Sequence, residues 1–302
     1  MPARTIDGRA LAQRLREQVK RDVEALVALD IPPNLVSLQV GESEPSQHYL
    51  ESQKRACGEV GILYTHVRLD RRIGERQFLA HVDGICKNPE VNGLIIQLPV
   101  PKRLAGAPLQ KAYRLMDPEK DVEGVHPSNQ GSVLSGQVEG ALLPCTALAV
   151  LALAREPGIP IRGKEAVVIG HSQIVGKPIS ALLLNEGATV TTCHVDTRDL
   201  SEHTRHADVL VVAVGRPGLV RGDMVKEGAI VIDVGLTYVD ERDEQGVLVT
   251  RPRGDVAFAE AAERAGHLTP VPGGVGPVTV AMLLSNTIQA ARFQARRRGM
   301  LK

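Results

Sequence analysis

The sequence VVIGHSQIVGKP, residues 167–178, joins an apolar strand to a helix through a glycine turn. Residues 166–169 form a short apolar run that predicts a buried strand, and residues 174–185 have the apolar spacing of a helix. Gly170 lets the backbone turn sharply between them, and the free N–H groups at the start of the helix can hold a diphosphate. The turn therefore indicates a doubly wound α/β domain with a candidate dinucleotide site.

Other glycine motifs can be compared with this loop by counting residues. A P-loop has four residues between its glycines and Ser or Thr after its Lys, but here five residues separate Gly170 from Gly176 and a proline follows Lys177. A nucleophile elbow needs Gly two residues after its Ser, and Ser172 is followed by Gln and Ile. Ser172 also replaces the middle glycine of a strict Gly-x-Gly-x-x-Gly fingerprint. The loop is either a Gly-x-Ser variant of a dinucleotide loop or an ordinary strand-to-helix turn.

The alternation of strands and helices continues after this loop. Residues 188–193, 208–215 and 229–235 are apolar runs that predict further strands of one parallel sheet. Gly215 and Gly235 stand at the ends of the last two runs. Ligands of doubly wound sheets bind outside the carboxyl ends of the strands, so these glycines favour a cofactor site over an ordinary turn.

The first half of the chain has the same alternation and predicts a second parallel sheet with helices on both faces. The predicted helices are residues 9–29, 49–60, 75–88, 144–155 and 278–297, and the predicted strands are 35–40, 65–70 and 93–99. Residues 41–47 predict a polar loop, and 116–143, rich in Gly, Pro, Asn and Asp, predict a long functional loop.

The predicted fold is therefore α/β with two domains. An N-terminal three-layer domain with a parallel sheet is expected at 1–143, completed by a C-terminal helix at 279–302. A Rossmann-type dinucleotide-binding domain is expected at 144–278, with a cleft between the two.

Composition excludes several classes of protein. The 302 residues carry 36 Lys and Arg against 35 Asp and Glu, a balance that argues against nucleic-acid binding, and Arg296–Arg298 is interpreted as a solvated tail. No apolar stretch is long enough to span a membrane, and the start lacks the apolar core of a secretory signal. The four cysteines, Cys57, Cys86, Cys145 and Cys193, have neither zinc spacing nor a disulfide pattern. We expect a cytoplasmic protein with reduced thiols and no metal site.

Six segments resemble the bifunctional methylenetetrahydrofolate dehydrogenase/cyclohydrolase family in sequence, order and interval. They are SQHYLESQKRA (46–56), GLIIQLPVP (93–101), DPEKDVEGVHPSN (117–129), VVIGHSQIVGKP (167–178), VIDVG (231–235) and TPVPGGVGPVT (269–279). The resemblance implies an enzyme of one-carbon metabolism that oxidises 5,10-methylenetetrahydrofolate to the methenyl cation with a nicotinamide dinucleotide. It also implies a second activity in the same cleft, hydrolysis to 10-formyltetrahydrofolate, and a homodimer.

The resemblance also implies site residues. Tyr49 occupies the position of the family's aromatic ring beside the pterin. Gln97 occupies the position of a Gln that hydrogen-bonds the catalytic Lys and the folate, and Asp121 that of a carboxylate that binds the amino edge of the pterin. The implied catalytic set is Tyr49, Gln53, Gln97 and Asp121, and the implied substrate contacts also include Leu98, Pro272, Gly273, Gly274, Val275 and Gly276. His126 is expected to be a hydrogen-bonded structural residue.

Residue 53 departs from the family pattern. The catalytic Lys of the family lies four residues after the Tyr, and that position is Gln53 in this sequence. An amide cannot exchange protons at ordinary pH, whereas hydride transfer depends mainly on alignment, so we expect dehydrogenase activity with weak or absent cyclohydrolase activity. Lys54 lies about 100° further round the helix. The alternatives are a one-residue shift of the helix that lets Lys54 substitute, and a fully bifunctional enzyme.

The second departure concerns the cofactor, which is NADP in most of the family. The residues expected to contact it are Gly170, His171, Ser172, Val175, Val195, Asp196, Gly215, Gly235 and Leu236. Val195 and Asp196 stand where Ser and a basic residue are common, and His171 where Arg often occurs. A carboxylate here accepts a hydrogen bond from a ribose hydroxyl and repels a phosphate, which favours NAD, although Arg198 can restore a phosphate contact.

Two other classes share parts of this pattern. An amino-acid or 2-hydroxy-acid dehydrogenase has the same two-lobed plan, but does not explain Gln97, Asp121 and the 269–279 loop together. A non-catalytic folate- or nucleotide-binding protein remains compatible with Gln53. Reduction of the cofactor on addition of methylenetetrahydrofolate separates both classes from the dehydrogenase.

Overall fold

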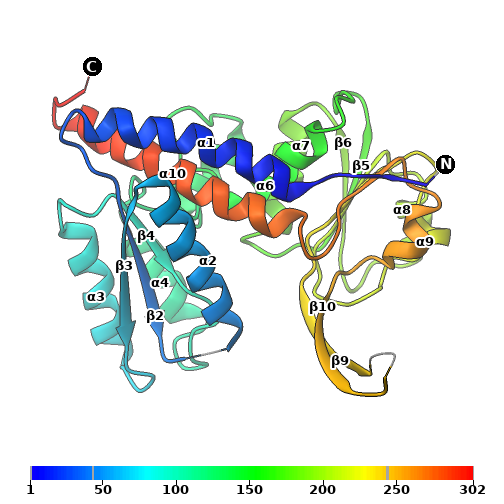
Figure 1. The fold of residues 1–302 in the computed structure, drawn as a ribbon, viewed down its shortest axis with the longest axis horizontal. Helices are drawn as coiled ribbons and strands as arrows, with labels where there is room; N and C mark the ends of the chain where they lie inside the picture. Colours follow the sequence, from blue (N-terminus) through cyan, green and yellow to red (C-terminus); the bar gives the residue numbers. More distant parts are fainter. Residues whose placement is uncertain (1, 43, 243–244, 302) are drawn as a thin grey trace. The chain divides into compact units, whose positions relative to one another are not determined.

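The computed structural model describes residues 2–42, 44–242 and 245–301 and divides the chain into two compact units (Figure 1). One unit comprises residues 13–145 and 280–302, and the other comprises 1–12 and 146–279. The first twelve residues thus lie outside the unit in which the sequence places them. The reason is that β1 (Arg4–Thr5) pairs in parallel with β11 (His267–Leu268).

The unit of residues 13–145 and 280–302 is built on a three-stranded parallel sheet in the order β3-β2-β4, as the alternation predicts. Its strands are β2 (Asn34–Val40), β3 (Leu63–Leu69) and β4 (Gly93–Ile96). Its helices are α2 (Glu44–Val60), α3 (Glu75–Lys87), α4 (Ala107–Leu115) and α5 (Pro127–Ser135), with most of α1 (Gly8–Val27) and α10 (Val275–Arg297).

The core of this unit is aliphatic. Val19, Val23 and Leu26 bury one face of α1, and Leu35 and Ile95 bury the neighbouring strands β2 and β4. These positions on α1 are spaced at the helical period, which is why the periodicity of residues 9–29 predicts the helix correctly.

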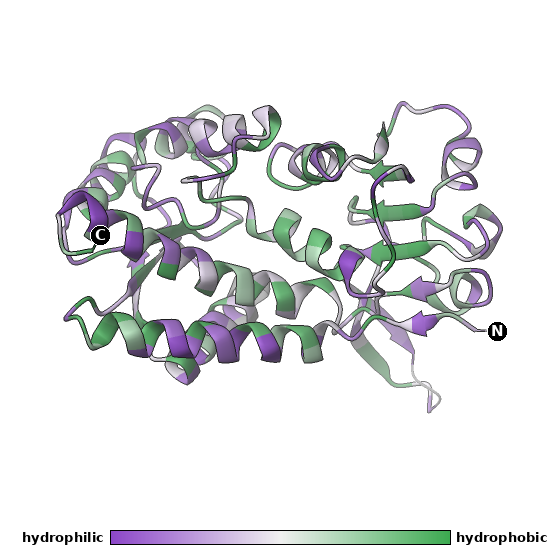
Figure 2. Ribbon diagram, turned by 90° about the horizontal axis from the view of Figure 1, so that it is seen from above, coloured by the Kyte–Doolittle hydropathy of each residue, from purple (hydrophilic) through white to green (hydrophobic). Residues whose placement is uncertain are grey.

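The other unit contains a six-stranded parallel sheet in the order β1-β11-β8-β7-β5-β6. The central strands include β5 (Glu165–Ile169), β7 (Val209–Val212) and β8 (Ile230–Asp233), and β6 (Thr189–Cys193) forms one edge. The helices of this unit are α6 (Cys145–Arg155), α7 (Gly176–Asn185), α8 (Leu200–Thr204), η1 (Gly222–Met224) and α9 (Phe258–Ala262). Hydrophobic residues predominate along β5, β7 and β8 (Figure 2), as expected when helices cover both faces of a parallel sheet.

Three corrections concern helices. Helix α2 begins at Glu44, within the predicted polar loop, of which residue 43 lies outside the described residues. The predicted long loop contains α5, which Pro127 starts and the left-handed Gly136 ends. Helix α10 begins at Val275 rather than 278.

The fourth correction is an antiparallel ribbon of β9 (Thr237–Arg242) and β10 (Leu248–Arg253), which the sequence does not predict. Its strands carry charged side chains and lack a continuous apolar face, so no alternating pattern marks them. The ribbon extends away from the six-stranded sheet (Figure 1).

No helix within the described parts of the chain is both long and apolar enough to cross a membrane.

Candidate functional site

Gln53 lies on the buried face of α2, one turn after Tyr49. Its side chain is 0 % exposed, whereas the next residue, Lys54, is exposed to solvent. The helix therefore has the register that a four-residue spacing predicts. The alternative in which a shifted helix brings Lys54 into the place of Gln53 is wrong for this structure.

The amide oxygen of Gln53 accepts two hydrogen bonds. Gln97 donates to Gln53 Oε1 from Nε2 at 2.8 Å, and the Tyr64 hydroxyl donates at 3.3 Å. Gln97 Nε2 also donates to Ser37 Oγ at 3.0 Å, and Ser37 is fully buried on β2. The structure thus brings together Tyr49, Gln53 and Gln97. The sequence gives one weak signal for Ser37, a hydroxyl inside the apolar run of β2, and none for Tyr64.

Asp121 is held by its own loop. Its carboxylate accepts hydrogen bonds from the backbone N–H groups of Val125 at 3.1 Å and His126 at 2.7 Å, and from Asn129 Nδ2 at 2.8 Å. His126 in turn caps α5, because its Nδ1 accepts from the N–H of Ser128, which agrees with the structural role expected for it. These contacts fix the turn into α5 and use most of the acceptor capacity of Asp121. Substrate binding by Asp121 stays a prediction.

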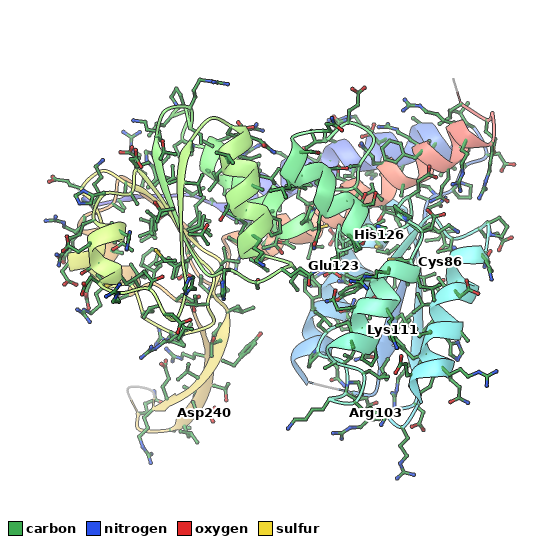
Figure 3. The ribbon with its side chains drawn as sticks, turned by 180° about the vertical axis from the view of Figure 1, so that it is seen from behind. Cys86, Arg103, Lys111, Glu123, His126 and Asp240 are labelled. Atoms are coloured by element: carbon green, nitrogen blue, oxygen red, sulfur yellow. The ribbon has the colours of Figure 1, made fainter. Side chains whose placement is uncertain are left out.

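Glu123, labelled in Figure 3, lies two residues further on and has an uncommitted carboxyl oxygen. Its Oε2 is buried and has no hydrogen-bond partner among the described residues. Burial, with a smaller contribution from Asp121, raises the pKa of Glu123 to about 8. Burial raises the pKa of Tyr49 as well, and the charge of Glu123 is the next largest cause, so Glu123 lies near Tyr49. Two carboxylates in KDVEGVHP are visible in the sequence, but not which of them is free.

Gly124 fixes the path of the chain beside Glu123. Its φ is +73°, and a Cβ there would lie 2.4 Å from the backbone nitrogen of Pro144. The N–H of Cys145, at the start of α6, donates to the backbone oxygen of Glu123. The close approach of these two backbone segments therefore fixes the backbone position from which Glu123 buries its Oε2.

The predicted dinucleotide loop is a strand-to-helix turn with room only for glycine at positions 170 and 176. Gly170 has φ +118°, and a Cβ there would lie 2.3 Å from the backbone oxygen of Ala213. A Cβ on Gly176, at the start of α7, would lie 1.9 Å from the backbone oxygen of Gly170. Val175 and Ser172 precede the helix, and no side chain from Val175 caps it. The N–H of Gly176 donates to Ser172 Oγ at 3.4 Å and that of Lys177 donates to the backbone oxygen of Ser172 at 3.1 Å. Binding of a dinucleotide diphosphate at the start of α7 therefore stays a prediction.

We expect Gly176→Ala to destabilise the protein by at least about 2 kcal/mol, because the added methyl group meets rigid backbone. Thermal unfolding of the purified variant measures this effect. Gly84→Ala is the matched control, since its Cβ would have no atom within 4 Å in helix α3. Equal unfolding temperatures of the Gly176 variant and wild type would contradict the tight turn.

The ends of β5 and β6 bring three predicted cofactor residues together. The His171 ring stacks on the ring of His194, with centroids 4.8 Å apart and planes 25° apart. His194 Nδ1 accepts a hydrogen bond from the backbone N–H of Asp196 at 3.2 Å. Val195 is 92 % exposed and the Asp196 side chain 85 % exposed, so both are available to a ligand. His194 is part of this group, although the sequence does not single it out.

Two buried carboxylates position the remaining strand ends. Asp255 accepts from the N–H groups of Val214 and Gly215 at the end of β7, at 2.7 and 2.9 Å. Asp233 accepts from the N–H of Gly235 after β8, and burial raises the pKa of Asp233 to about 6. Leu236 follows, with its side chain exposed. The predicted residues that follow β5, β6, β7 and β8 therefore all lie on the side of the sheet formed by the carboxyl ends of these parallel strands.

The other predicted substrate contacts lie in two segments. Leu98 follows β4 and is partly exposed. In the segment Pro272–Gly276, Gly273 has φ +116°, and a Cβ on Gly274 would lie 2.7 Å from the backbone oxygen of Pro270. Val275 and Gly276 belong to the first turn of α10 rather than to a loop. The close backbone approach predicted for this segment is present within it.

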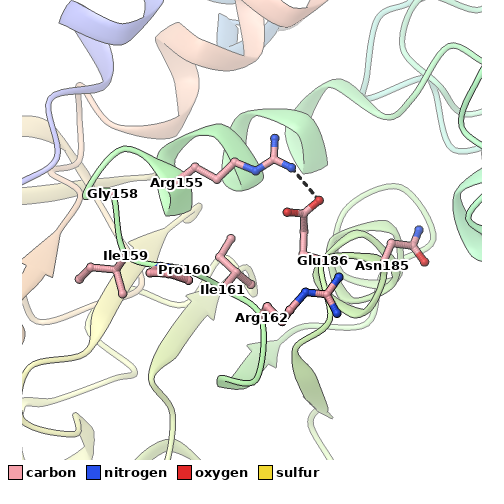
Figure 4. A pocket seen from close by; sticks show the side chains of 8 residues that line it. All are labelled: Arg155, Gly158, Ile159, Pro160, Ile161, Arg162, Asn185 and Glu186. Atoms are coloured by element: carbon pink, nitrogen blue, oxygen red, sulfur yellow. Dashed lines mark hydrogen bonds and ion pairs between the residues drawn. The ribbon is translucent and has the colours of Figure 1, made fainter.

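A cavity of about 450 Å³ lies at the opposite end of β5 from Gly170 (Figure 4). It is lined by Arg155, Gly158, Ile159, Pro160, Ile161, Arg162, Asn185 and Glu186. Arg155 is paired with Glu186 at 2.6 Å. None of the predicted site residues lines this cavity, so it is separate from the predicted dinucleotide site at the carboxyl ends of the strands.

Comparison with protein families gives two matches that together cover most of the chain. Residues 6–123 match the tetrahydrofolate dehydrogenase/cyclohydrolase catalytic domain, and residues 144–295 match the NAD(P)-binding domain of the same proteins. The chain belongs to the tetrahydrofolate dehydrogenase/cyclohydrolase family.

Members of this family are similar to the chain over nearly its whole length. The "Bifunctional protein FolD" of Bordetella petrii is 46 % identical over 293 residues, which are 97 % of this chain and 95 % of the relative. Among solved structures, the bifunctional FolD dehydrogenase/cyclohydrolase of Campylobacter jejuni is 41 % identical with a TM-score of 0.87, covering 96 % of this chain and 98 % of that one. The Trypanosoma brucei enzyme, solved with NADP and an inhibitor, is 36 % identical with a TM-score of 0.91 and covers 98 % and 99 %.

The family assignment agrees with the division of the site residues. The match to the family's catalytic domain includes Tyr49, Gln53, Gln97 and Glu123, and the match to its NAD(P)-binding domain includes the glycine turn and the His171–His194 stack. The two-domain α/β fold expected from the sequence is confirmed, with a parallel sheet in each unit.

Proposed function

We propose that this chain oxidises 5,10-methylenetetrahydrofolate to 5,10-methenyltetrahydrofolate with NAD(P)⁺ and has weak or no cyclohydrolase activity. The observation that carries the proposal is the buried, non-titrating amide of Gln53 beside Tyr49 and Gln97. Family membership supports the dehydrogenase part, since both family domains match. The proposal includes the homodimer that the resemblance implies.

The residues near Gln53 supply binding and alignment for the oxidation. The flat ring of Tyr49 offers a stacking surface for the reduced pterin, and Gln97 offers hydrogen bonds to the folate. Glu123 has a buried carboxyl oxygen without a partner to offer the N–H groups on the pterin amino edge, whereas Asp121 is occupied by its loop. We therefore assign to Glu123 the role that the resemblance gives to Asp121. NAD(P)⁺ supplies the hydride acceptor.

Hydrolysis of the methenyl cation needs a group that takes a proton from water and passes it on. Gln53 cannot do so at ordinary pH, and Lys54 is turned to solvent. The similar proteins from Bordetella petrii and Campylobacter jejuni are named bifunctional, and these names support the alternative, a chain with both activities, better than a loss of one. The identity of residue 53 is the observation that favours the loss.

Paired assays on one purified sample test this proposal. Formation of reduced cofactor from 5,10-methylenetetrahydrofolate should be rapid, and hydrolysis of 5,10-methenyltetrahydrofolate should proceed near its uncatalysed rate. A catalysed hydrolysis comparable with the oxidation would establish the bifunctional alternative. An absence of cofactor reduction would contradict the dehydrogenase itself.

For the cofactor, the proposal favours NAD over NADP. Asp196 is exposed next to the stacked histidines, where its carboxylate can accept a bond from a ribose hydroxyl and repels a phosphate. The related Trypanosoma brucei structure contains NADP, which supports the opposite preference.

We expect Asp196→Ser to shift the ratio of kcat/KM values toward NADP by about fivefold, because the repelling charge is removed. Initial rates with both cofactors measure the ratio. Glu202→Gln, which removes an exposed charge on α8, is the control and should leave it unchanged. A wild-type preference for NADP together with an unchanged ratio in the Asp196 variant would contradict the assignment.

A further inference from the structure

The hydrogen bonds around Gln53 form a closed ring of four side chains. Gln97 uses one Nε2 hydrogen on Gln53 Oε1 and the other on Ser37 Oγ. Tyr64 donates its hydroxyl hydrogen to Gln53 Oε1. Ser37 donates to the Tyr64 oxygen, a hydrogen bond that lowers the pKa of Tyr64 while burial, the larger cause, raises it to about 12. The hydrogens of Gln97 Nε2, Tyr64 and Ser37 therefore all have acceptors within the ring.

The ring fixes which edge of the Gln53 amide is free. Two donors point at Oε1, and turning the Gln53 amide by 180° while Gln97 stays in place would put its NH₂ group against the NH₂ group of Gln97. The NH₂ group is thus on the opposite side, where Gln53 Nε2 is buried and has no hydrogen-bond partner among the described residues. The NH₂ group faces the adjacent Tyr49, whose pKa a side-chain hydrogen bond from Gln53 lowers against the larger effect of burial, so at most one of the two amide hydrogens has this phenol as its acceptor. A buried, unpaired donor beside Tyr49 costs free energy unless a ligand accepts from it.

We propose that Tyr64 and Ser37 are positioning residues that lock Gln53 as a hydrogen-bond donor to an acceptor atom of the bound folate. This inference rests on the proposed function, because it takes the group beside Tyr49 to be the folate site. Neither residue needs to touch the substrate. Tyr64 acts by holding Gln53 Oε1, and Ser37 acts by holding both Tyr64 and Gln97. Residue 53 then contributes recognition of the substrate in place of proton transfer.

The test is the pair Tyr64→Phe and Ser37→Ala, alone and combined. Each removes one donor from the ring and frees the Gln53 amide to turn. We expect the Kd for tetrahydrofolate, measured by calorimetry without oxygen, and the KM for methylenetetrahydrofolate to rise about fivefold in each single variant. The kcat should stay within about twofold. Because both variants break the same ring, the double variant should weaken binding little more than either single one.

Two controls separate positioning from a general structural role. Tyr238→Phe makes the same chemical change on β9 and should leave the Kd unchanged. Ser37→Thr keeps the hydroxyl and should retain most of the wild-type affinity. A structural role alone would lower the unfolding temperature without the KM-against-kcat split.

The outcomes divide cleanly between the two proposals. Unchanged Kd and KM in Tyr64→Phe, or fully additive effects in the double variant, would overturn the ring while leaving the dehydrogenase in place. A wild-type protein that binds tetrahydrofolate but oxidises no methylenetetrahydrofolate would contradict the proposed function. The positioning role of Tyr64 and Ser37 would then be tested by the Kd values of their variants alone. A wild-type protein that binds no folate would overturn both.

Discussion

Replacing Gln53 by lysine is expected to raise the hydrolysis of 5,10-methenyltetrahydrofolate by at least about 100-fold, the usual contribution of one well-placed acid–base group. The substitution puts an amine on the buried face of α2, one turn from Tyr49. Burial favours the neutral form of an amine and brings its pKa toward neutrality, where it can both accept and donate a proton. The rate of loss of the methenyl compound, corrected for the uncatalysed reaction, measures the effect.

The ring around residue 53 can accommodate this lysine. An ammonium group only donates, so the Gln97 amide must turn to present its oxygen, and the Ser37 hydroxyl can then donate to or accept from it. Lys54→Gln is the control, because Lys54 is exposed and should contribute nothing to either reaction. A Gln53→Lys protein that oxidises the methylene compound normally but hydrolyses no faster than wild type would contradict the assignment of residue 53 as the missing proton carrier.

Glu123→Gln is expected to weaken folate binding at least tenfold at pH 8.5 and to abolish its pH dependence. The pKa of Glu123 is raised to about 8, by burial first and by Asp121 second, so the free protein carries a neutral carboxyl at pH 6. Accepting hydrogen bonds from the pterin amino edge requires the ionised form. Wild-type affinity should therefore increase about tenfold per pH unit between pH 6 and 7 and level off above pH 8.

Calorimetry in two buffers with different ionisation enthalpies tests this coupling directly. Wild type should release nearly one proton on binding tetrahydrofolate at pH 6.5, and Glu123→Gln should release none. The neighbouring Tyr49, Tyr113 and Cys145 keep their protons in this range, because burial raises the pKa of each. Glu51→Gln, an exposed carboxylate on α2, is the matched control. Equal proton release in the Glu123 variant would assign the titration to another group, with Asp121 the first to examine.

The parallel strands were predictable because each is a short apolar run between turn residues. β5 and β7 are fully apolar along their buried parts, β8 is apolar up to the buried Asp233, and Gly170 marks the point where β5 ends. The position of Gln53 was predictable as well, since the four-residue spacing from Tyr49 depends only on the helical period. The β9–β10 ribbon was not, because its residues alternate in exposure without a sustained apolar pattern.

The choice between Asp121 and Glu123 shows where sequence stops being sufficient. Both are carboxylates in one short segment, and either can face a ligand. What separates them is the fold: α5 begins six residues after Asp121, and its N-cap residue His126 and its Asn129 supply donors that occupy the carboxylate. The surroundings of the Glu123 carboxyl group depend on the close approach of Pro144 to Gly124, a contact between segments about twenty residues apart in the chain. Such contacts are set by tertiary structure, so no local pattern identifies the free group.

Each compact unit is assembled from two separate stretches of chain, because residues 1–12 join 146–279 and residues 280–302 join 13–145. A gene fragment that encodes residues 146–279 alone would lack β1 and leave β11 as an unpaired edge strand. An unpaired edge strand can form hydrogen bonds with a strand of another molecule and cause aggregation. Neither lobe can be excised as one continuous piece. To produce the nucleotide-binding lobe alone, residues 1–12 would have to be joined to residues 146–279 in one engineered chain.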